Sequence, residues 1–304
     1  MFTDQMQSNL GFVTSQTAYI ETGVYKHRFA SIRYPGLIPV DYSANPWART
    51  VDYYSMNSAG QAQWVADRAK DLKFVGTEYG KSTTTVHMAN IGYDFGIEEV
   101  HQAAMLGQNL QGDKALAARM AYEHMVDRVA FEGDAEKGFQ GLYNNTGVTA
   151  ISATTGDWAT ATEAQILADV NELLTGIFTA TNEIAMADTL ILPSAKRQYI
   201  GSTQLGDTQI TILEFLQKNN SFTAETGRPL TIISSRGLDA AGAGGTSRMV
   251  AYRRSPEVLK MHIPMQHEFL PVQIKGLSYE IPGIFRLGGL DIRLTEEVRY
   301  SDGI

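Results

Sequence analysis

The chain of 304 residues contains no cysteine. This absence excludes disulfide bonds, thiolate zinc sites, iron–sulfur clusters and a cysteine nucleophile. Charged residues are also scarce, at 19% of the chain, where a soluble protein carries about 25%. The net charge of −8 argues against a protein that binds nucleic acid mainly through its charge. So little charge suits a protein that covers part of its surface with copies of itself.

Long hydrophobic runs are missing as well. The apolar stretches fall short of the roughly 18 residues that a membrane-spanning helix needs, so we expect no membrane span. Residues 1–5 lack the basic start and apolar stretch of a secretory signal. With 43% hydrophobic residues, the chain is too apolar for global disorder and long enough to bury a core in one or two domains.

Residues 1–50 combine prolines with aromatic and aliphatic side chains. Pro35, Pro39 and Pro46 disfavour a long helix or a central strand. The apolar side chains between and beside them still need to be covered: Tyr34, Leu37, Ile38, Val40 and Trp47. Two interpretations remain open. The segment is a strand on the chain's own core, or it is an arm that lies on a neighbouring subunit.

Residues 51–95 predict a long β-hairpin. Residues 51–54 form the first leg, and the β-branched residues 83–88 form the return leg. Gly76 and Gly80 allow a turn between the legs, which places Lys81 near the tip. Large aliphatic side chains are few here, so the hairpin has no core of its own and needs a partner to lie on. We expect Trp64 to contact that partner.

Residues 96–133 give the strongest helical pattern. A first helix covers 97–106, residues 107–112 interrupt it, and Asp113 is the expected N-cap of a second helix that ends at Gly133. Two apolar stripes on this second helix predict a central spine packed between two layers. One stripe is Ala118, Tyr122, Met125, Val126, Val129 and Ala130, and the other is Leu116, Met120, His124 and Phe131.

Residues 151–275 alternate helical and strand patterns, which predicts an α+β or α/β unit. Helices are expected at 162–178, 194–200 and 211–216, and strands at 189–193, 230–233 and 249–252. Residues 240–245, with Gly242, Gly244 and Gly245, predict a flexible loop. Strands separated by prolines and glycines follow, and the period-two pattern of 289–294 predicts a strand that closes a sheet late in the chain.

Motifs that carry chemistry are weak throughout the chain. Residues 76–82 resemble a phosphate-binding loop, but three residues instead of four separate the two glycines. His262, His267 and Glu268 lack the i, i+4 spacing of a helix-borne zinc site. No serine stands in a Gly-x-Ser-x-Gly context. We therefore predict no catalytic residue, no cofactor and no metal.

Three stretches, taken in order, resemble the major capsid proteins of tailed double-stranded DNA phages. The first runs from Ile38-Pro39-Val40-Asp41 through Trp47 to Tyr53-Tyr54 and on to residues 60–72. The second is residues 95–103 with the spine helix and the Gly141-Leu142-Tyr143-Asn144 exit. The third is Leu190-Ile191-Leu192-Pro193, its following helix and the glycine-rich loop. The resemblance spans almost the whole chain and implies the α+β Hong Kong-type capsid fold, which encapsulins share.

The resemblance implies a division of the chain. Residues 1–50 would be an N-terminal arm, 51–95 an extended loop, 96–150 and 276–304 a peripheral domain, and 151–275 an axial domain. Gly242, Gly244 and Gly245 would lie near the centre of a capsomer. The residues expected to contact other subunits are Tyr34, Leu37, Ile38, Val40, Trp47, Trp64 and Lys81.

The resemblance also implies a structural function without catalysis. Copies of the chain would form pentamers and hexamers and close into a head shell around double-stranded DNA, assembled in the bacterial cytoplasm and retained in the virion. A separate scaffolding protein, a portal and a decoration protein would be partners, and DNA contacts would be loose. Two alternatives are an encapsulin shell and, from a different class, a soluble α/β enzyme that binds phosphate at residues 76–82.

Overall fold

The computed structural model describes residues 31–59, 74–106 and 110–304. Its largest sheet has five strands, of which the three inner ones are buried along most of their length. The strand order is β10 (Thr231–Ser235), β9 (Thr189–Pro193), β11 (Arg248–Tyr252), β18 (Val298–Asp302) and β8 (Thr149–Ser152). β10 is parallel to β9, β18 is parallel to β8, and β11 runs antiparallel to both of its neighbours.

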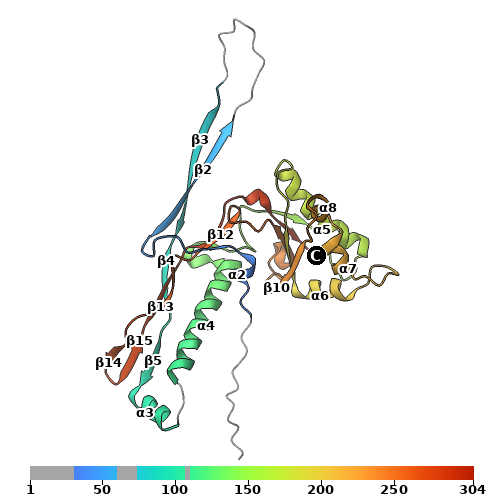
Figure 1. Cartoon of the computed structure of the whole chain (residues 1–304). Coiled ribbons are helices and arrows are strands. Elements are labelled where there is room, and N and C mark those ends of the chain that lie inside the picture. Colours follow the sequence, from blue (N-terminus) through green and yellow to red (C-terminus); the bar gives the residue numbers. More distant parts are fainter. Residues whose placement is uncertain (1–30, 60–73, 107–109) are drawn as a thin grey trace, which may run out of the picture. The chain divides into compact units, whose positions relative to one another are not determined.

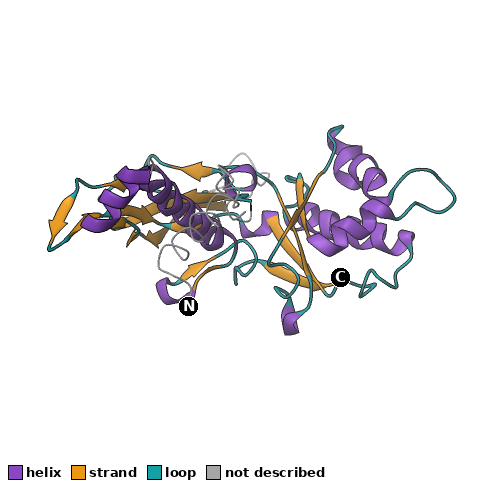
Figure 2. Ribbon diagram, turned by 90° about the horizontal axis from the view of Figure 1, so that it is seen from below, coloured by secondary structure: helices purple, strands orange, loops and turns teal. Residues whose placement is uncertain are grey.

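Both faces of this sheet are covered, as the alternation of side chains along its strands requires. In β9, Leu190 and Leu192 face one apolar core and Ile191 faces another. The first core is closed by helices that come from the middle of the chain, seen as ribbons beside the sheet in Figure 2. They are α5 (Glu163–Ala180), α6 (Ser194–Ser202), α7 (Ile212–Lys218) and α8 (Ser221–Thr226).

The helix α5 follows the sequence pattern closely. Its N-cap is Thr162, whose backbone N–H donates to Gln165 Oε1 at 2.9 Å, and its buried positions are those with a helical spacing. These are Ile166, Val170, Leu173, Leu174 and Ile177. The predicted helix at 162–178 and the predicted strand at 189–193 are therefore confirmed.

The second core is packed against α4 (Leu110–Phe131), which follows the shorter α3 (Ile97–Leu106). The first predicted stripe of α4 is buried except for the half-buried Met125. In the second stripe Phe131 is buried and Leu116 is exposed. The helix also begins three residues before the predicted N-cap, so Asp113 lies in its first turn. A negative charge there still favours the positive end of the helix dipole.

Two glycines shape the chain where α4 ends. Gly133 has φ of +77°, a conformation that favours glycine. A Cβ on Gly141 would overlap the carbonyl group of Phe131, so only glycine fits this close crossing. Asn144 locks the crossing, since its Oδ1 accepts from Gly141 N and its Nδ2 donates to Glu132 O, both at 2.7 Å.

Smaller sheets combine early and late parts of the chain. They are β1 (Val40–Asp41), β12 (Leu259–His262) and β17 (Gly289–Ile292); β13 (Met265–Phe269), β16 (Gly283–Leu287) and β4 (His87–Asn90); β14 (Gln273–Lys275), β15 (Ser278–Ile281) and β5 (Tyr93–Gly96); and the pair β6 (Gly133–Asp134) and β7 (Phe139–Gln140). Strand pairing therefore does not follow the expected boundary at 275/276. β18 belongs to the five-stranded sheet, while β12, β13 and β14 pair outside residues 151–275.

A buried ion pair fastens the last strand to the sheet. Arg248 Nε lies 2.6 Å from Asp302 Oδ1, Nη2 lies 2.8 Å from Oδ2, and Nη1 donates to Tyr143 O at 2.6 Å. The guanidinium also covers the ring of Tyr300. Burial alone would raise the pKa of the Asp302 carboxyl, but the hydrogen bonds from Arg248 and Ala243 N lower it overall.

We predict that Arg248→Met destabilises the unassembled subunit by about 3–5 kcal/mol, because Asp302 would remain buried without its cation. Urea unfolding followed by circular dichroism measures the effect. Adding Asp302→Asn should restore much of the loss, since it removes the stranded charge. The stability that Asp302 contributes should be present at neutral pH and be lost as the pH falls through its lowered pKa. Equal acid sensitivity of the wild type and the double variant would contradict this assignment.

Candidate assembly surfaces

The long hairpin is a ribbon of two strands, and within the described part of the chain no third strand pairs with it. β2 (Thr50–Ala59) pairs antiparallel with β3 (Gly76–Thr85), with Thr50 opposite Thr85 and Ala59 opposite Gly76 (Figure 1). Every residue of β3 except Thr84 is exposed. Because a two-stranded ribbon is marginally stable in water, this one needs a surface to lie on.

One face of the hairpin is apolar. Residues opposite each other in an antiparallel pair share a face, and Tyr54 lies opposite Lys81 while Met56 lies opposite Tyr79. Tyr54, Met56 and Tyr79 are 73%, 62% and 71% exposed, and we call them the tyrosine face. The other face is mixed, with Tyr53 opposite Ser82, Ser55 opposite Gly80 and Asn57 opposite Glu78. The hairpin thus presents an uncovered hydrophobic face.

Lys81 does not lie at the hairpin tip. Gly76, Gly80 and Lys81 are all within β3, and the Lys81 ammonium lies 2.8 Å from Asp52 Oδ2 across the ribbon. This hydrogen bond raises the pKa of Lys81 and lowers that of Asp52. Trp64 and the connection at residues 60–73 lie outside the described residues.

The strand geometry also decides the phosphate-loop alternative. Residues 76–82 each have a partner residue on β2, so the backbone is extended and does not curl around an anion. A phosphate-binding loop needs successive N–H groups that converge on one point before a helix begins. The observed strand is incompatible with that arrangement.

The segment around α2 (Tyr34–Leu37) lies on the chain's own core. Tyr34, Leu37 and Ile38 are 3%, 2% and 0% exposed. Tyr34 N donates to Asp127 Oδ1 of α4 at 3.0 Å, and Tyr252 Oη donates to Leu37 O at 2.8 Å. These three side chains have almost no surface left for a neighbour. Of the two open interpretations, packing on the chain's own core describes them, although residues 34–37 form a short helix and not the expected strand.

Two other expected contact residues lie further along. Val40 is half-buried in β1, which pairs parallel with β12. Trp47 is 68% exposed, although the preceding carbonyl of Pro46 is held by Arg286 Nη1 at 2.8 Å. Trp47 is therefore presented by a fixed backbone with most of its ring uncovered, and it keeps its place as a candidate contact.

The glycine-rich loop is held by hydrogen bonds, in contrast to the flexible loop that the sequence predicts. Gly242 N donates to Thr246 O at 2.8 Å, and Ala243 N donates to Asp302 Oδ2 at 2.9 Å. Gly244 and Gly245 have φ of +68° and +77°, which explains their glycine. The loop is a tight turn fastened to the last strand.

A second apolar surface was not predicted from the sequence. The hairpin of β14 and β15 exposes Ile274 and Leu277, at 77% and 80%, beside Val272. Ile97 N at the start of α3 donates to Leu277 O at 3.1 Å, which ties α3 to this hairpin. Its pattern of aliphatic residues around Pro271 and Gly276 could have indicated an exposed hairpin tip.

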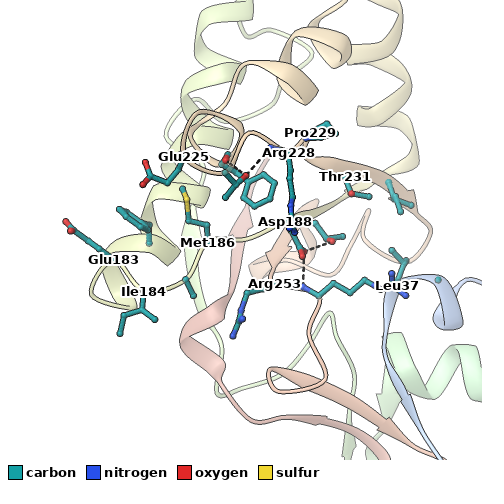
Figure 3. A pocket seen from close by; sticks show the side chains of 18 residues that line it. Leu37, Glu183, Ile184, Met186, Asp188, Glu225, Arg228, Pro229, Thr231 and Arg253 are labelled. Atoms are coloured by element: carbon teal, nitrogen blue, oxygen red, sulfur yellow. Dashed lines mark hydrogen bonds between the residues drawn. The ribbon is translucent and has the colours of Figure 1, made fainter.

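A groove of about 730 Å³ runs beside β10 and the loop that follows α5 (Figure 3). Two of its charged groups are paired within the subunit. Asp188 accepts from Arg254 N at 2.8 Å, and Arg253 forms an ion pair with Glu297. Ile184 stands on the rim, 84% exposed. This lining suits packing more than chemistry, because no nucleophile lies beside a free base.

The other candidates for chemistry do not come together. His262 is buried between Asp41 and Asp291, whose nearest oxygens lie 3.8 Å and 3.6 Å from its two ring nitrogens. His267 points inward from β13 and stacks on Tyr122, while Glu268 points outward. Among residues 31–59, 74–106 and 110–304, no group of acidic and histidine side chains could hold a metal. No helix in that part of the chain is suited to crossing a membrane.

Solved structures share this fold. A chain from the capsid of Myoviridae phage XM1 has a TM-score of 0.81 at 17% identity, covering 95% of this chain and 98% of that chain. A chain from Microbacterium phage Oxtober96 has a TM-score of 0.65 at 14% identity, covering 96% and 98%. A virus-like particle from Pyrococcus furiosus has a TM-score of 0.52 at 10% identity, covering 88% and 91%. The expected Hong Kong-type fold is confirmed.

Sequence comparison adds the family. No curated protein gives a significant match to the chain. Residues 60–304 match the family model described as major capsid protein. Because this match covers well over half of the sequence, the chain belongs to the major capsid protein family and is a structural protein of a capsid shell.

Proposed function

We propose that copies of this chain form pentamers and hexamers that close into the icosahedral head shell of a tailed phage around its DNA. The observation that carries the proposal is the tyrosine face, an apolar surface on a ribbon that has no core of its own. A neighbouring subunit is the natural cover for it, since burying aromatic side chains supplies much of the free energy of association. Catalysis has no place in this function.

The degree of likeness to solved structures supports a phage head. The XM1 capsid chain has a TM-score of 0.81 over nearly all of both chains, against 0.52 for the Pyrococcus furiosus particle. Assembly would take place in the bacterial cytoplasm, with a scaffolding protein, a portal and a decoration protein as partners. The net charge of −8 supports loose contacts with packaged DNA, because an acidic wall does not hold a polyanion.

The remaining expected positions are part of this proposal. Trp47, Val40, Trp64 and Lys81 are proposed to lie at or near subunit contacts, and Gly242, Gly244 and Gly245 near the capsomer centre. The arm, the extended loop and the peripheral and axial domains keep their proposed roles, with the domain boundaries moved to follow strand pairing. Tyr34, Leu37 and Ile38 are not retained as contacts, because they are buried within the subunit.

The purified chain, alone or with its scaffolding protein, should form closed particles in negative-stain electron microscopy. Shell contacts of standard size bury roughly 1,600 Å² each, and several per subunit make the closed particle stable. Native mass spectrometry of the disassembled material should give pentamers or hexamers. Monomers alone, under conditions in which the chain is folded, would contradict the proposal.

Replacing the tyrosine face should impair assembly and spare folding. We expect Tyr54→Ser with Tyr79→Ser to raise the subunit concentration needed for shells at least ~100-fold, since each buried aromatic ring contributes about 1.5–3 kcal/mol. Light scattering measures assembly, and urea unfolding measures folding. Ser82→Ala, on the other face of the same ribbon, is the matched control. Loss of subunit stability in parallel with assembly would place the two tyrosines in the subunit's own fold.

Two truncations separate the arm from the core segment. Deleting residues 1–31 should leave a folded subunit that no longer forms shells. Deleting residues 1–45 also removes Leu37 and Ile38, which are buried, at a cost of about 2–5 kcal/mol for each large side chain. This longer deletion should unfold the subunit, as thermal melts would show. Normal shells from the shorter deletion would remove the arm from the assembly contacts.

A further inference from the structure

The helix α5 has a glycine in its interior where an alanine would favour the helix. A Cβ on Gly176 would overlap the guanidinium of Arg299, which reaches over from β18. Arg299 lies opposite Thr149 of β8, at the outermost pair of strands in the five-stranded sheet. The glycine therefore makes room for one particular cation.

That cation has no partner within the described residues. Arg299 Nε is buried without a hydrogen-bond acceptor, and no carboxylate of the described residues forms an ion pair with this side chain. Arg248 pairs with Asp302 and Arg253 pairs with Glu297, so the other partly buried arginines of this sheet are matched. A buried N–H donor without an acceptor costs free energy, although the rest of this half-exposed side chain borders the solvent. The fold alone does not account for it.

The guanidinium borders an open groove of about 450 Å³. Apart from Arg299 and Glu172, the lining consists of small side chains of α5 that allow another chain to approach closely: Thr175, Gly176, Thr179 and Ala180. The adjacent edge strand β8 is exposed and carries neither charge nor proline. The opposite edge is guarded, because Arg33 and Arg197 donate to outward carbonyls of β10.

We propose that Arg299 and this groove of α5 receive a carboxylate-bearing segment from another copy of the chain. A carboxylate matches the forked donors of arginine and would supply the anion that Arg299 lacks within the subunit. The chain supplies such groups in excess, with 33 acidic against 25 basic residues. Glu172 lines the same groove, and its negative charge disfavours a polyanion such as nucleic acid more than it disfavours a single carboxylate. The inference rests on the proposed shell function and assigns one of its contacts.

The first test compares three variants of the full chain. Arg299→Met should leave the melting temperature of the unassembled subunit within a few degrees of wild type and raise the concentration needed for shells at least tenfold. Arg299→Lys should recover part of the loss, since it keeps the charge but not the fork. Arg119→Met, an exposed arginine on α4, is the matched control for net charge and should assemble like wild type.

A second variant keeps the arginine and displaces it. Gly176→Ala should melt no lower than wild type, because the atom it meets is the movable end of a side chain. It should nevertheless impair assembly, because the guanidinium can no longer occupy its place. Gly201→Ala, in α6 where a Cβ would make only an ordinary van der Waals contact with Leu213, is the control. Assembly equal to wild type would overturn the proposal, even if Arg299→Met had failed to fold.

A density map of the assembled wild-type shell is the direct test. A carboxylate oxygen of a neighbouring copy should lie about 3 Å from the Arg299 guanidinium. Water alone, a phosphate of nucleic acid or another protein in the groove would overturn the proposal. Wild-type shells with an unoccupied Arg299 would refute this contact and leave the proposed function standing, whereas absence of wild-type shells would refute both.

Discussion

Two-sided burial of the five-stranded sheet is the constraint on which the other elements depend. The inner strands β9 and β11 supply both cores, so Leu190 and Ile191 serve opposite faces of β9. The same alternation in β18 sends Tyr300 to the core on the α4 side and Arg299 towards α5. Because β18 comes after every other described strand and carries Val298 and Tyr300, the core on the α4 side is complete only once this strand has joined the sheet. The Arg248–Asp302 pair then fixes that last strand from within.

Sequence patterns predicted the elements whose surroundings are simple. Periodicity was sufficient to predict α5, whose five apolar positions all face one core, and β9, a fully buried strand that ends at a proline. Gly76 and Gly80 were misplaced because glycine marks turns in most contexts, while in an exposed ribbon it costs little. The start of α4 was missed by three residues because Asp113 suits both an N-cap and a first turn.

The assembly surfaces were harder to predict, for a physical reason. An apolar side chain is expected to be buried, but its residue type does not show whether its own subunit or a neighbour buries it. Leu37 and Trp47 are both apolar residues of the same proline-rich segment. Leu37 is buried in the core, where its carbonyl accepts from Tyr252, whereas Trp47 is mostly exposed. Arg299 gave no sequence signal at all, since its environment depends on Gly176, which is more than a hundred residues away.

The uncovered features lie on separate elements, which bears on how a shell can close. In a closed particle, each subunit contacts several neighbours, and different surfaces of the subunit form these contacts. The tyrosine face, the tip of β14 and β15 and the Arg299 groove are three such surfaces of different chemistry. Each alone is small, so a single wrong contact would dissociate readily, whereas a subunit held by several neighbours at once would be retained. The scarcity of charge fits this arrangement. Buried ion pairs such as Arg248–Asp302 and Arg253–Glu297 lie inside the subunit, and the proposed contacts between subunits are mainly apolar.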